Sequence, residues 1–370
     1  MIVGVPKEIK ADENRIGIVP AGVEALTRRG HEVLIQDGAG VGSGISNEQF
    51  DAVGAKIVPD VETLYGSAEM IMKVKEPLES EYELITEEML VFTYFHFAAD
   101  ETLTRAMIDS GAACVAYETV RLQDGSLPLL APMSEVAGRM SVQEGAKYLE
   151  KFFGGRGVLL GGIPGVRPGN VVIIGGGIVG TNAAKMACGL GANVSILDID
   201  LDRLRYLDDV MPANCMTIVS TPFSVRESVR DADLVIGAVL VEGAKAPKLV
   251  TREMLAEMQE AAVIVDVAVD QGGCVETTRP TTHHDPVYMV DGILHYAVAN
   301  MPGAVPRTST YGLTNATLPY ALKLAEEGID ALKADPALLH GLNVFRGRVT
   351  HEGVSDAFDL DFTDPREAIS

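Results

Sequence analysis

Three glycines at the spacing G-x-G-x-x-G follow an apolar run in the segment 170–198. Gly175 lets the chain turn off a strand, Gly177 leaves room for a pyrophosphate beside the backbone, and Gly180 lets a helix pack closely on that strand. The helix directs free N–H groups and the positive end of its dipole at the phosphates. The segment therefore predicts a dinucleotide site. The alternative is a glycine-rich turn in an α/β fold that binds no cofactor.

A carboxylate, Asp198, ends the second strand of the same segment. In this position a carboxylate binds the 2′-hydroxyl of an adenosine ribose and repels a 2′-phosphate, so the pattern favours NAD over NADP. Arg203, on the following predicted helix, is a weak argument for NADP; the alternative is an exposed helix arginine.

Four further polar residues lie near the carboxyl ends of predicted parallel strands, the edge where open α/β sheets bind ligands. Arg15 lies in the loop after the first strand, Lys75 ends the run MIMKVK, His96 ends VFTYFH, and Asp270 follows VIVDVAV. Arginine grips a carboxylate, lysine polarises a carbonyl oxygen, histidine moves a proton near neutral pH, and aspartate activates water. The set suits a small keto or amino acid beside a nicotinamide. For each residue alone, the alternative is a surface charge or, for His96 among aromatic residues, a structural histidine.

Alternating strands and helices must position these residues, and this alternation predicts parallel sheets with helices on both faces. We expect an α/β fold with two doubly wound, mostly parallel-sheet, Rossmann-like domains and an interdomain cleft. The first domain has predicted strands at 2–5, 33–36, 70–74, 90–95 and 113–119, and predicted helices at 21–29, 48–53, 61–65 and 101–110. The second has predicted strands near 171–175, 193–198, 215–220, 233–239, 262–268 and 287–298.

Two long helices mark the expected domain boundaries. Ser134 is a natural N-cap for a helix that ends near residue 153, and another helix is predicted over about 308–327. We expect a discontinuous substrate domain of residues 1–128 and 307–370 and an NAD-binding domain of residues 129–306. A second glycine-rich segment, GAGVGSG at 38–44, lacks the acid-ended second strand and is interpreted as a flexible turn.

Composition excludes several classes of protein. The net charge of −22 argues against nucleic acid or an anionic membrane as a partner. No apolar run approaches the roughly 20 residues that span a bilayer, and no secretory signal pattern is recognised, so we expect a cytoplasmic location. The four cysteines lie far apart without a C-x-x-C, so neither a zinc site nor a disulfide framework is indicated.

Over residues 1 to about 345 the sequence resembles the alanine dehydrogenase family. That family also includes the NAD-binding subunit of proton-translocating transhydrogenase and lysine-forming saccharopine dehydrogenase. The resemblance lies in GVPKEIKADENRIGIVP, MKVKEP, YFHFA, GGGIVG, VDVAVDQGG and VANMPGAVPRTSTYGLTNATLPY, in the expected order. The last segment and His96 favour the dehydrogenase over the transhydrogenase subunit.

The resemblance implies NAD-dependent, reversible oxidative deamination of L-alanine to pyruvate and ammonium, by a homohexamer. It implies Arg15 and Lys75 as substrate-binding residues and His96 and Asp270 as the catalytic acid–base residues. No metal site is expected; Lys323 and Glu327 are interpreted as an exposed pair. The alternatives are a saccharopine-type dehydrogenase or a transhydrogenase-like NAD-binding subunit. The cofactor contacts implied are Ser134, Gly175, Gly177, Ile178, Val179, Gly180, Asp198, Arg203, Ser220, Val239, Leu240, Val267, Ala268, Val269, Asp270, Arg279, Val298, Ala299, Asn300 and Met301.

Overall fold

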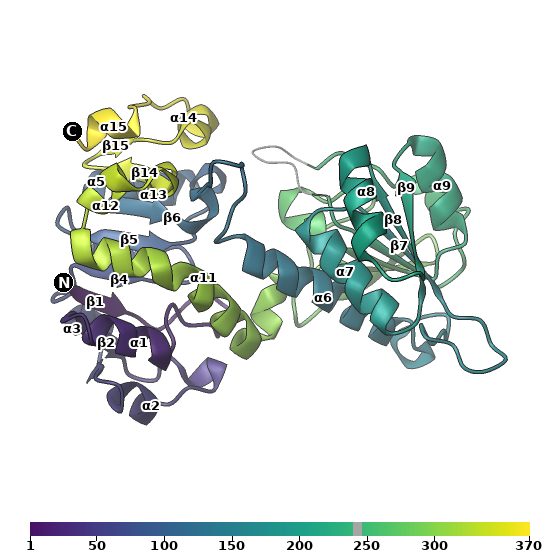
Figure 1. Cartoon of the computed structure of the whole chain (residues 1–370), viewed down its shortest axis with the longest axis horizontal. Helices are drawn as coiled ribbons and strands as arrows, with labels where there is room; N and C mark the ends of the chain where they lie inside the picture. The colour runs from purple at the N-terminus through teal and green to yellow at the C-terminus, as the bar shows by residue number, and fades with distance from the viewer. Residues whose placement is uncertain (240–245) are drawn as a thin grey trace. The chain divides into compact units, whose positions relative to one another are not determined.

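The chain forms two compact units, each built on its own sheet (Figure 1). The first unit comprises Met1–Met133 and Val305–Ser370, and the second comprises Ser134–Ala304. The computed structural model describes residues 1–239 and 246–370. Within these ranges, no helix is both long and apolar enough to span a lipid bilayer.

The sheet of the first unit has the strand order β15-β14-β6-β5-β4-β1-β2-β3. Strands β1 to β6 pair in parallel, whereas β14 is antiparallel to both β6 and β15. The order reverses between β1 and β4, so this unit has a topological switch point, where doubly wound sheets bind ligands. The strands are β1 (Ile2–Val5), β2 (Glu32–Gln36), β3 (Lys56–Val58), β4 (Met70–Met72), β5 (Leu90–Thr93), β6 (Ala113–Ala116), β14 (Leu342–Phe345) and β15 (Arg348–Val349).

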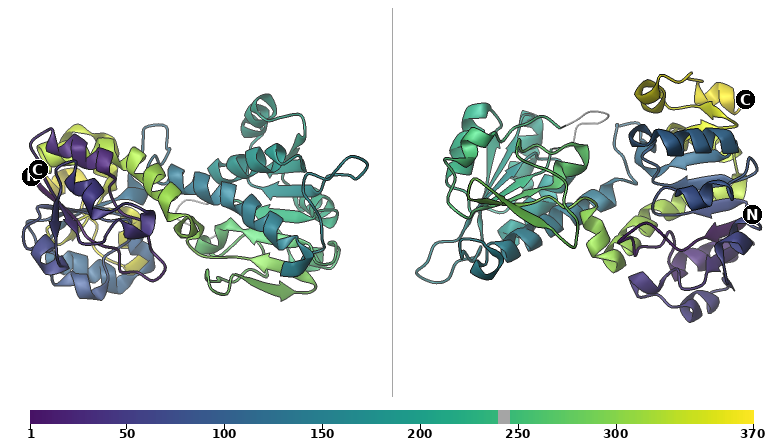
Figure 2. Two further views of the ribbon diagram at one scale, coloured as in Figure 1. Left: turned by 90° about the horizontal axis from the view of Figure 1, so that it is seen from below. Right: turned by 180° about the vertical axis from the view of Figure 1, so that it is seen from behind.

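Helices cover both faces of this sheet (Figures 1 and 2). On one face, Tyr65 of α3, Leu103 of α5 and Val354 of α14 join the strand side chains in a buried apolar cluster. On the other face, α1 packs against the long helix α11. The helices are α1 (Pro20–Thr27), α2 (Asn47–Asp51), α3 (Val61–Tyr65), α4 (Glu79–Tyr82), α5 (Glu101–Ser110), α11 (Pro306–Glu327), α12 (Asp330–Ala334), α13 (Pro336–Gly341), α14 (Glu352–Phe358) and α15 (Pro365–Ala368), with 3-10 turns η1 (Val41–Ser43), η2 (Phe97–Ala99) and η3 (Tyr117–Thr119).

The sheet of the second unit has the order β12-β13-β11-β10-β7-β8-β9, with a switch point between β7 and β10. All neighbours pair in parallel except β12 with β13. The predicted fold class, two doubly wound and mostly parallel sheets, is confirmed. The strands are β7 (Asn170–Ile174), β8 (Asn193–Asp198), β9 (Cys215–Val219), β10 (Leu234–Gly237), β11 (Val263–Asp266), β12 (Val287–Val290) and β13 (Ile293–Tyr296).

Close packing by small residues brings two helices onto one face of this second sheet. A Cβ on Gly145 of α6 would lie 2.6 Å from the Leu234 side chain, and one on Gly180 of α7 would lie 3.2 Å from the side chain of Ile173. The opposite face buries Val225 and Met254, from α9 and α10. The helices are α6 (Ala131–Tyr148), α7 (Ile178–Gly189), α8 (Leu201–Val210), α9 (Pro222–Arg230) and α10 (Arg252–Leu255), with 3-10 turns η4 (Lys151–Phe153), η5 (Val267–Gln271) and η6 (Met301–Ala304).

Several elements differ from the sequence-based prediction, which contained no strand at the positions of β3, β14 and β15. Helix α6 begins at Ala131, so Ser134 lies inside the helix and is not its N-cap; Pro132 is compatible with a first helical turn. The single strand predicted over 287–298 is a hairpin, because Asp291 and Gly292 both adopt positive φ angles, 50° and 81°, and reverse the chain.

Candidate functional site

The glycine turn between β7 and α7 has the geometry of a phosphate cradle. Gly175 has φ +106°, and a Cβ there would lie 2.6 Å from the Ala238 carbonyl oxygen. A Cβ on Gly180 would lie 1.8 Å from the carbonyl oxygen of Gly175. Around Gly177, in contrast, no atom of the described residues beyond its own chain neighbours lies within 4 Å of the Cβ position. Since Gly177 is also the N-cap of α7, the open space faces free helix N–H groups, which suits a pyrophosphate.

Asp198 and Arg203 are both tied to this turn. The Gly176 N–H donates to Asp198 Oδ2 (2.6 Å), and the Asp200 N–H donates to Asp198 Oδ1 (2.9 Å). Arg203 donates from Nε to the Gly176 carbonyl (2.6 Å) and from Nη2 to Thr181 Oγ1 (2.7 Å). Arg203 is therefore not the exposed helix arginine that the sequence suggested as one alternative; it is half-buried and braces the turn.

Most of the other predicted cofactor residues lie at the carboxyl edge of the same sheet. Ser220 follows β9, Val239 follows β10, Val267–Asp270 form η5 after β11, and Val298–Met301 follow β13. Arg279 is exposed in the segment between η5 and β12, with its guanidinium 4.1 Å from the ring centre of Tyr288. Leu240 lies outside the described residues.

A buried carboxylate that the sequence analysis missed, Asp266, supports the turn η5 that carries Asp270. Asp266 accepts hydrogen bonds from the N–H groups of Ala268 (3.1 Å) and Val275 (3.1 Å) and from Thr278 Oγ1 (2.6 Å). Asp270 itself is exposed at the end of this supported turn. The alternating pattern VIVDVAVD contains both aspartates, but nothing in it distinguishes the buried one from the exposed one.

In the first unit, Arg15 is almost completely buried and paired with Glu13. Arg15 Nε and Nη2 donate to the two carboxylate oxygens of Glu13 at 2.7 and 2.6 Å. Burial on its own would raise the pKa of Glu13, but the hydrogen bonds and charge of Arg15 outweigh it and lower that pKa. Arg15 Nη1 lies 3.1 Å from Met133 Sδ. The guanidinium is thus held rigidly at the switch point after β1.

The loop that carries Arg15 is anchored by the second glycine-rich segment and by α11. Ser43 Oγ donates to the Asn14 carbonyl (2.9 Å), and the Ile16 N–H donates to Thr310 Oγ1 (3.2 Å). A Cβ on Gly42 would lie 2.8 Å from Asn14 side-chain atoms, so this glycine permits the close approach. The segment 38–44 was interpreted as a flexible turn; its buried Ser43 instead holds the Arg15 loop.

Lys75 lies just beyond β4, on the other side of the switch point. Its side chain is half-buried, and burial followed by the positive charge of Arg15 lowers the pKa of its ammonium. Thr93 Oγ1 donates to the Lys75 carbonyl (2.9 Å), and the Lys75 N–H donates to Glu8 Oε1 (3.3 Å). Two cationic side chains are therefore close together at one edge of the sheet, an arrangement that suits an anionic ligand.

His96 follows β5, the neighbour of β4, and has an unusual backbone conformation. Its φ of 54° lies in the left-handed region, and its N–H donates to Glu118 Oε1 (2.6 Å). The exposed ring stacks on Tyr94, with centres 5.8 Å apart and planes within 8°. Tyr94 is fixed in turn by a hydrogen bond from its hydroxyl to the Leu129 carbonyl (2.6 Å). The imidazole thus has one face packed on an anchored ring and remains accessible for proton transfer.

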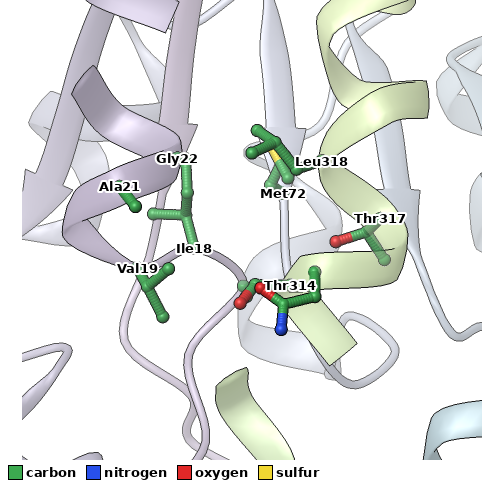
Figure 3. Close-up of a pocket in the computed structure, with 10 residues that line it drawn as sticks. Ile18, Val19, Ala21, Gly22, Met72, Thr314, Thr317 and Leu318 are labelled. Atoms are coloured by element: carbon green, nitrogen blue, oxygen red, sulfur yellow. The ribbon is translucent and has the colours of Figure 1, made fainter. Parts of the chain in front are cut away.

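Neither of the two cavities that stand out in the first unit coincides with this cluster. One, of about 30 Å³, lies between α1 and α11, where Ile18, Met72 and Leu318 line it (Figure 3). This space holds about two water molecules at most. The other is an open hollow beside Glu79 and Asp100, whose carboxylates would repel an anionic substrate.

The other sequence-based expectations concern ion pairs and metals. Lys323 Nζ forms its ion pair with Asp335 Oδ2 at 2.6 Å, and Glu327 contributes only a weaker charge interaction to Lys323. Among residues 1–239 and 246–370, no group of three or more His, Cys, Asp or Glu side chains is arranged to hold a metal ion.

Comparison with known proteins covers nearly the whole chain. Residues 4–137 match the family model "Alanine dehydrogenase/PNT, N-terminal domain", and residues 141–352 match "Alanine dehydrogenase/PNT, C-terminal domain". An alanine dehydrogenase of Methanococcus maripaludis is 56% identical over 372 residues, and one of Halomonas elongata is 53% identical over 370; both alignments cover 100% of each chain.

Solved structures give the same result. A structure of L-alanine dehydrogenase is 52% identical with a TM-score of 0.95, covering 97% of this chain and 99% of the other. A transhydrogenase from Sinorhizobium meliloti has a TM-score of 0.81 at 24% identity, covering 95% of this chain and 99% of the other; that similarity concerns the fold alone.

Proposed function

Because the chain belongs to the alanine dehydrogenase/PNT family, we propose that it catalyses the reversible, NAD-dependent oxidative deamination of L-alanine to pyruvate and ammonium. The observation that carries the proposal is full-length identity of 53–56% to curated alanine dehydrogenases, together with the cationic pair at the switch point of the first unit.

NAD is the cofactor that the second unit fits best. The open space at Gly177 accommodates a pyrophosphate, whereas Gly175 and Gly180 have no room for a side chain. Asp198 presents a carboxylate at the end of β8, which favours a ribose 2′-hydroxyl over a 2′-phosphate. When bound, NAD supplies the hydride acceptor. The predicted contacts from Ser134 to Met301, as given above, are part of this proposal.

Substrate binding is assigned to Arg15 and Lys75. Glu13 holds the guanidinium of Arg15 in a fixed orientation, from which it can grip a substrate carboxylate. Lys75 supplies a second positive charge, and its ammonium hydrogen-bonds the carboxylate of alanine or the carbonyl of pyruvate. Fixing the carboxylate at two points orients the Cα hydrogen for transfer, which is worth several kcal/mol in related reactions.

Proton transfer is assigned to His96 and Asp270. The amine loses a proton as hydride leaves Cα, and an imine of pyruvate forms. Water then adds to the imine carbon, and the resulting carbinolamine collapses to pyruvate and ammonium. His96, accessible and oriented by its stack on Tyr94, takes and returns the protons; Asp270 activates the water.

We also propose that the protein is a cytoplasmic homohexamer. The described cysteines, Cys114, Cys188, Cys215 and Cys274, are all unpaired, which fits a reducing compartment. Sedimentation velocity tests the assembly: a hexamer supports the proposal, and a monomer contradicts it.

Steady-state assays of the purified protein test the proposed reaction. With NAD⁺ we expect NADH formation from L-alanine to exceed that from L-serine, L-lysine or saccharopine. Turnover only with lysine or saccharopine would identify a saccharopine-type enzyme. Absence of turnover with every amino acid, combined with tight NADH binding, would favour a transhydrogenase-like NAD-binding subunit.

A further inference from the structure

Three buried charged side chains lie beside the switch point of the first unit. Lys73 Nζ is 2.8 Å from Glu81 Oε1 and 3.5 Å from Glu8 Oε2, and each side chain is at most 3% exposed. The Tyr65 hydroxyl donates a hydrogen bond to Glu81 Oε1 (3.0 Å). Burying charges is expensive even when they are paired, so stability alone is a weak reason for this trio.

The two carboxylates of the trio make different further contacts. Glu8 Oε1 accepts hydrogen bonds from the N–H groups of Val74 (2.6 Å) and Lys75 (3.3 Å), the second and third residues beyond the end of β4. Glu81 Oε2 instead accepts from the Leu78 N–H (2.9 Å), at the start of its own helix α4. Glu8 is therefore the member of the trio bound to the backbone of Lys75.

The peptide groups on both sides of Lys75 are fixed. Glu8 holds its N–H, and Thr93 Oγ1 donates to its carbonyl. Burial raises the pKa of Glu8, and the charge of Lys73 and the Val74 N–H oppose this effect without cancelling it. Lys73 is therefore the charge that most favours the carboxylate form of Glu8, the form that accepts these hydrogen bonds best. The backbone on either side of Lys75 sets the direction of its Cα–Cβ bond. Because Glu8 fixes that backbone, Glu8 sets the direction in which the Lys75 side chain leaves the main chain.

We propose that Glu8 is a positioning residue that directs Lys75 toward the substrate, and that Lys73 serves to keep Glu8 in place for this purpose. The inference rests on the proposed function, in which Lys75 binds the substrate carboxylate or carbonyl. Glu8 itself is assigned no contact with the substrate.

Glu8→Gln and Glu81→Gln form a matched pair that tests the proposal. Each removes one negative charge beside Lys73, but only Glu8→Gln weakens the hydrogen bonds to Val74 and Lys75. We expect Glu8→Gln to raise KM for both L-alanine and pyruvate by about tenfold, since small displacements of positioning groups have large kinetic effects. KM for NAD should stay within about twofold, because the residues proposed to bind NAD belong to the second unit, whereas Glu8 belongs to the first. Glu81→Gln should lower the unfolding temperature but leave all KM values within about twofold.

A second variant removes the acceptor altogether. Glu8→Met should raise KM for L-alanine further than Glu8→Gln, with NADH binding as the check that the protein is folded; if this variant does not fold, Glu8→Gln decides alone. Unchanged KM values in a folded Glu8→Gln protein would overturn the proposal. So would an equal rise in KM for Glu81→Gln, because the trio would then be purely structural.

A chemical readout separates this inference from the proposed reaction. Reductive methylation followed by mass spectrometry measures how fast the Lys75 amine reacts in the whole protein. Glu8→Gln should change that rate by about threefold or more, whereas Glu81→Gln should not. If the wild-type protein does not oxidise L-alanine, the proposed function fails, yet this labelling result still shows whether Glu8 positions Lys75.

Discussion

Gly177→Ala should weaken NAD binding by at least one order of magnitude without harming the fold. Gly177 has φ −66° and ψ −160°, an extended conformation open to alanine. Its new methyl group would meet no atom within 4 Å in the described part of the chain, apart from its own neighbours in sequence. Replacement of an unstrained glycine changes stability by about 1 kcal/mol or less. The methyl group would instead occupy the space proposed for the pyrophosphate and remove at least one hydrogen bond to a charged phosphate. Such a bond is worth about 1.5–3 kcal/mol, which corresponds to about a 10- to 150-fold weaker Kd.

Gly180→Ala is the matched control. Its methyl group would lie 1.8 Å from the Gly175 carbonyl oxygen, in the buried first turn of α7. Overpacking of this kind costs about 1–3 kcal/mol or more, which lowers the unfolding temperature of a unit this size by several degrees. We therefore expect Gly180→Ala to lose stability and NAD binding together, and Gly177→Ala to lose NAD binding only.

Thermal unfolding without ligand measures the stability of each variant. Titration of the protein with NADH, followed by the fluorescence of the bound nucleotide, measures its affinity. Wild-type affinity in Gly177→Ala would show that the phosphates do not approach this turn. An equal loss of stability in both variants would show that Gly177 serves packing, contrary to the open space around it.

Other substitutions probe the remaining assignments. His96→Ala should bind NADH normally but lose most turnover, about 10²-fold or more for a removed general acid–base group; near-normal kcat would exclude His96 from proton transfer. Asp198→Ala should weaken NAD binding and reduce the preference for NAD over NADP, measured as kcat/KM with NAD divided by kcat/KM with NADP. An unchanged ratio would show that another group recognises the ribose. Lys75→Met should abolish turnover yet raise the unfolding temperature at pH 7, because burial and Arg15 disfavour the ammonium. The unfolded state binds more protons than the folded state between the lowered pKa of Lys75 and its ordinary value, so stability rises with pH across that window in wild type. The difference in unfolding temperature between Lys75→Met and wild type should therefore shrink as the pH rises through that window. A lower unfolding temperature for the variant than for wild type at pH 7 would contradict this account.

The parts of the fold that sequence predicted well are those specified by local pattern. The apolar runs before Gly175 and Lys75 gave strands in the right places, because buried parallel strands are short and continuously apolar. Boundaries were less certain where two local signals competed. Ser134 has the residue type of an N-cap, but the helix had already begun at Ala131.

The supporting contacts of the candidate site could not be predicted, because they join residues far apart in sequence. Glu8 accepts a hydrogen bond from Lys75, which lies 67 residues away in sequence. The Asn14 carbonyl accepts one from Ser43, which lies 29 residues away. Glu118 holds the His96 N–H from 22 positions away. Some contacts are local, such as the Glu13–Arg15 pair, two residues apart. Its spacing in a loop does not distinguish a buried pair from two surface charges.

The central claim is that this chain transfers hydride from the Cα of alanine to C4 of nicotinamide. Incubation with NAD⁺ and L-alanine deuterated at Cα, followed by NMR of the isolated NADH, tests it most directly. We predict one deuterium at C4 of the NADH, formed in step with pyruvate and ammonium. NADH that carries no deuterium, or no NADH at all from a folded protein that binds NAD, would contradict the account.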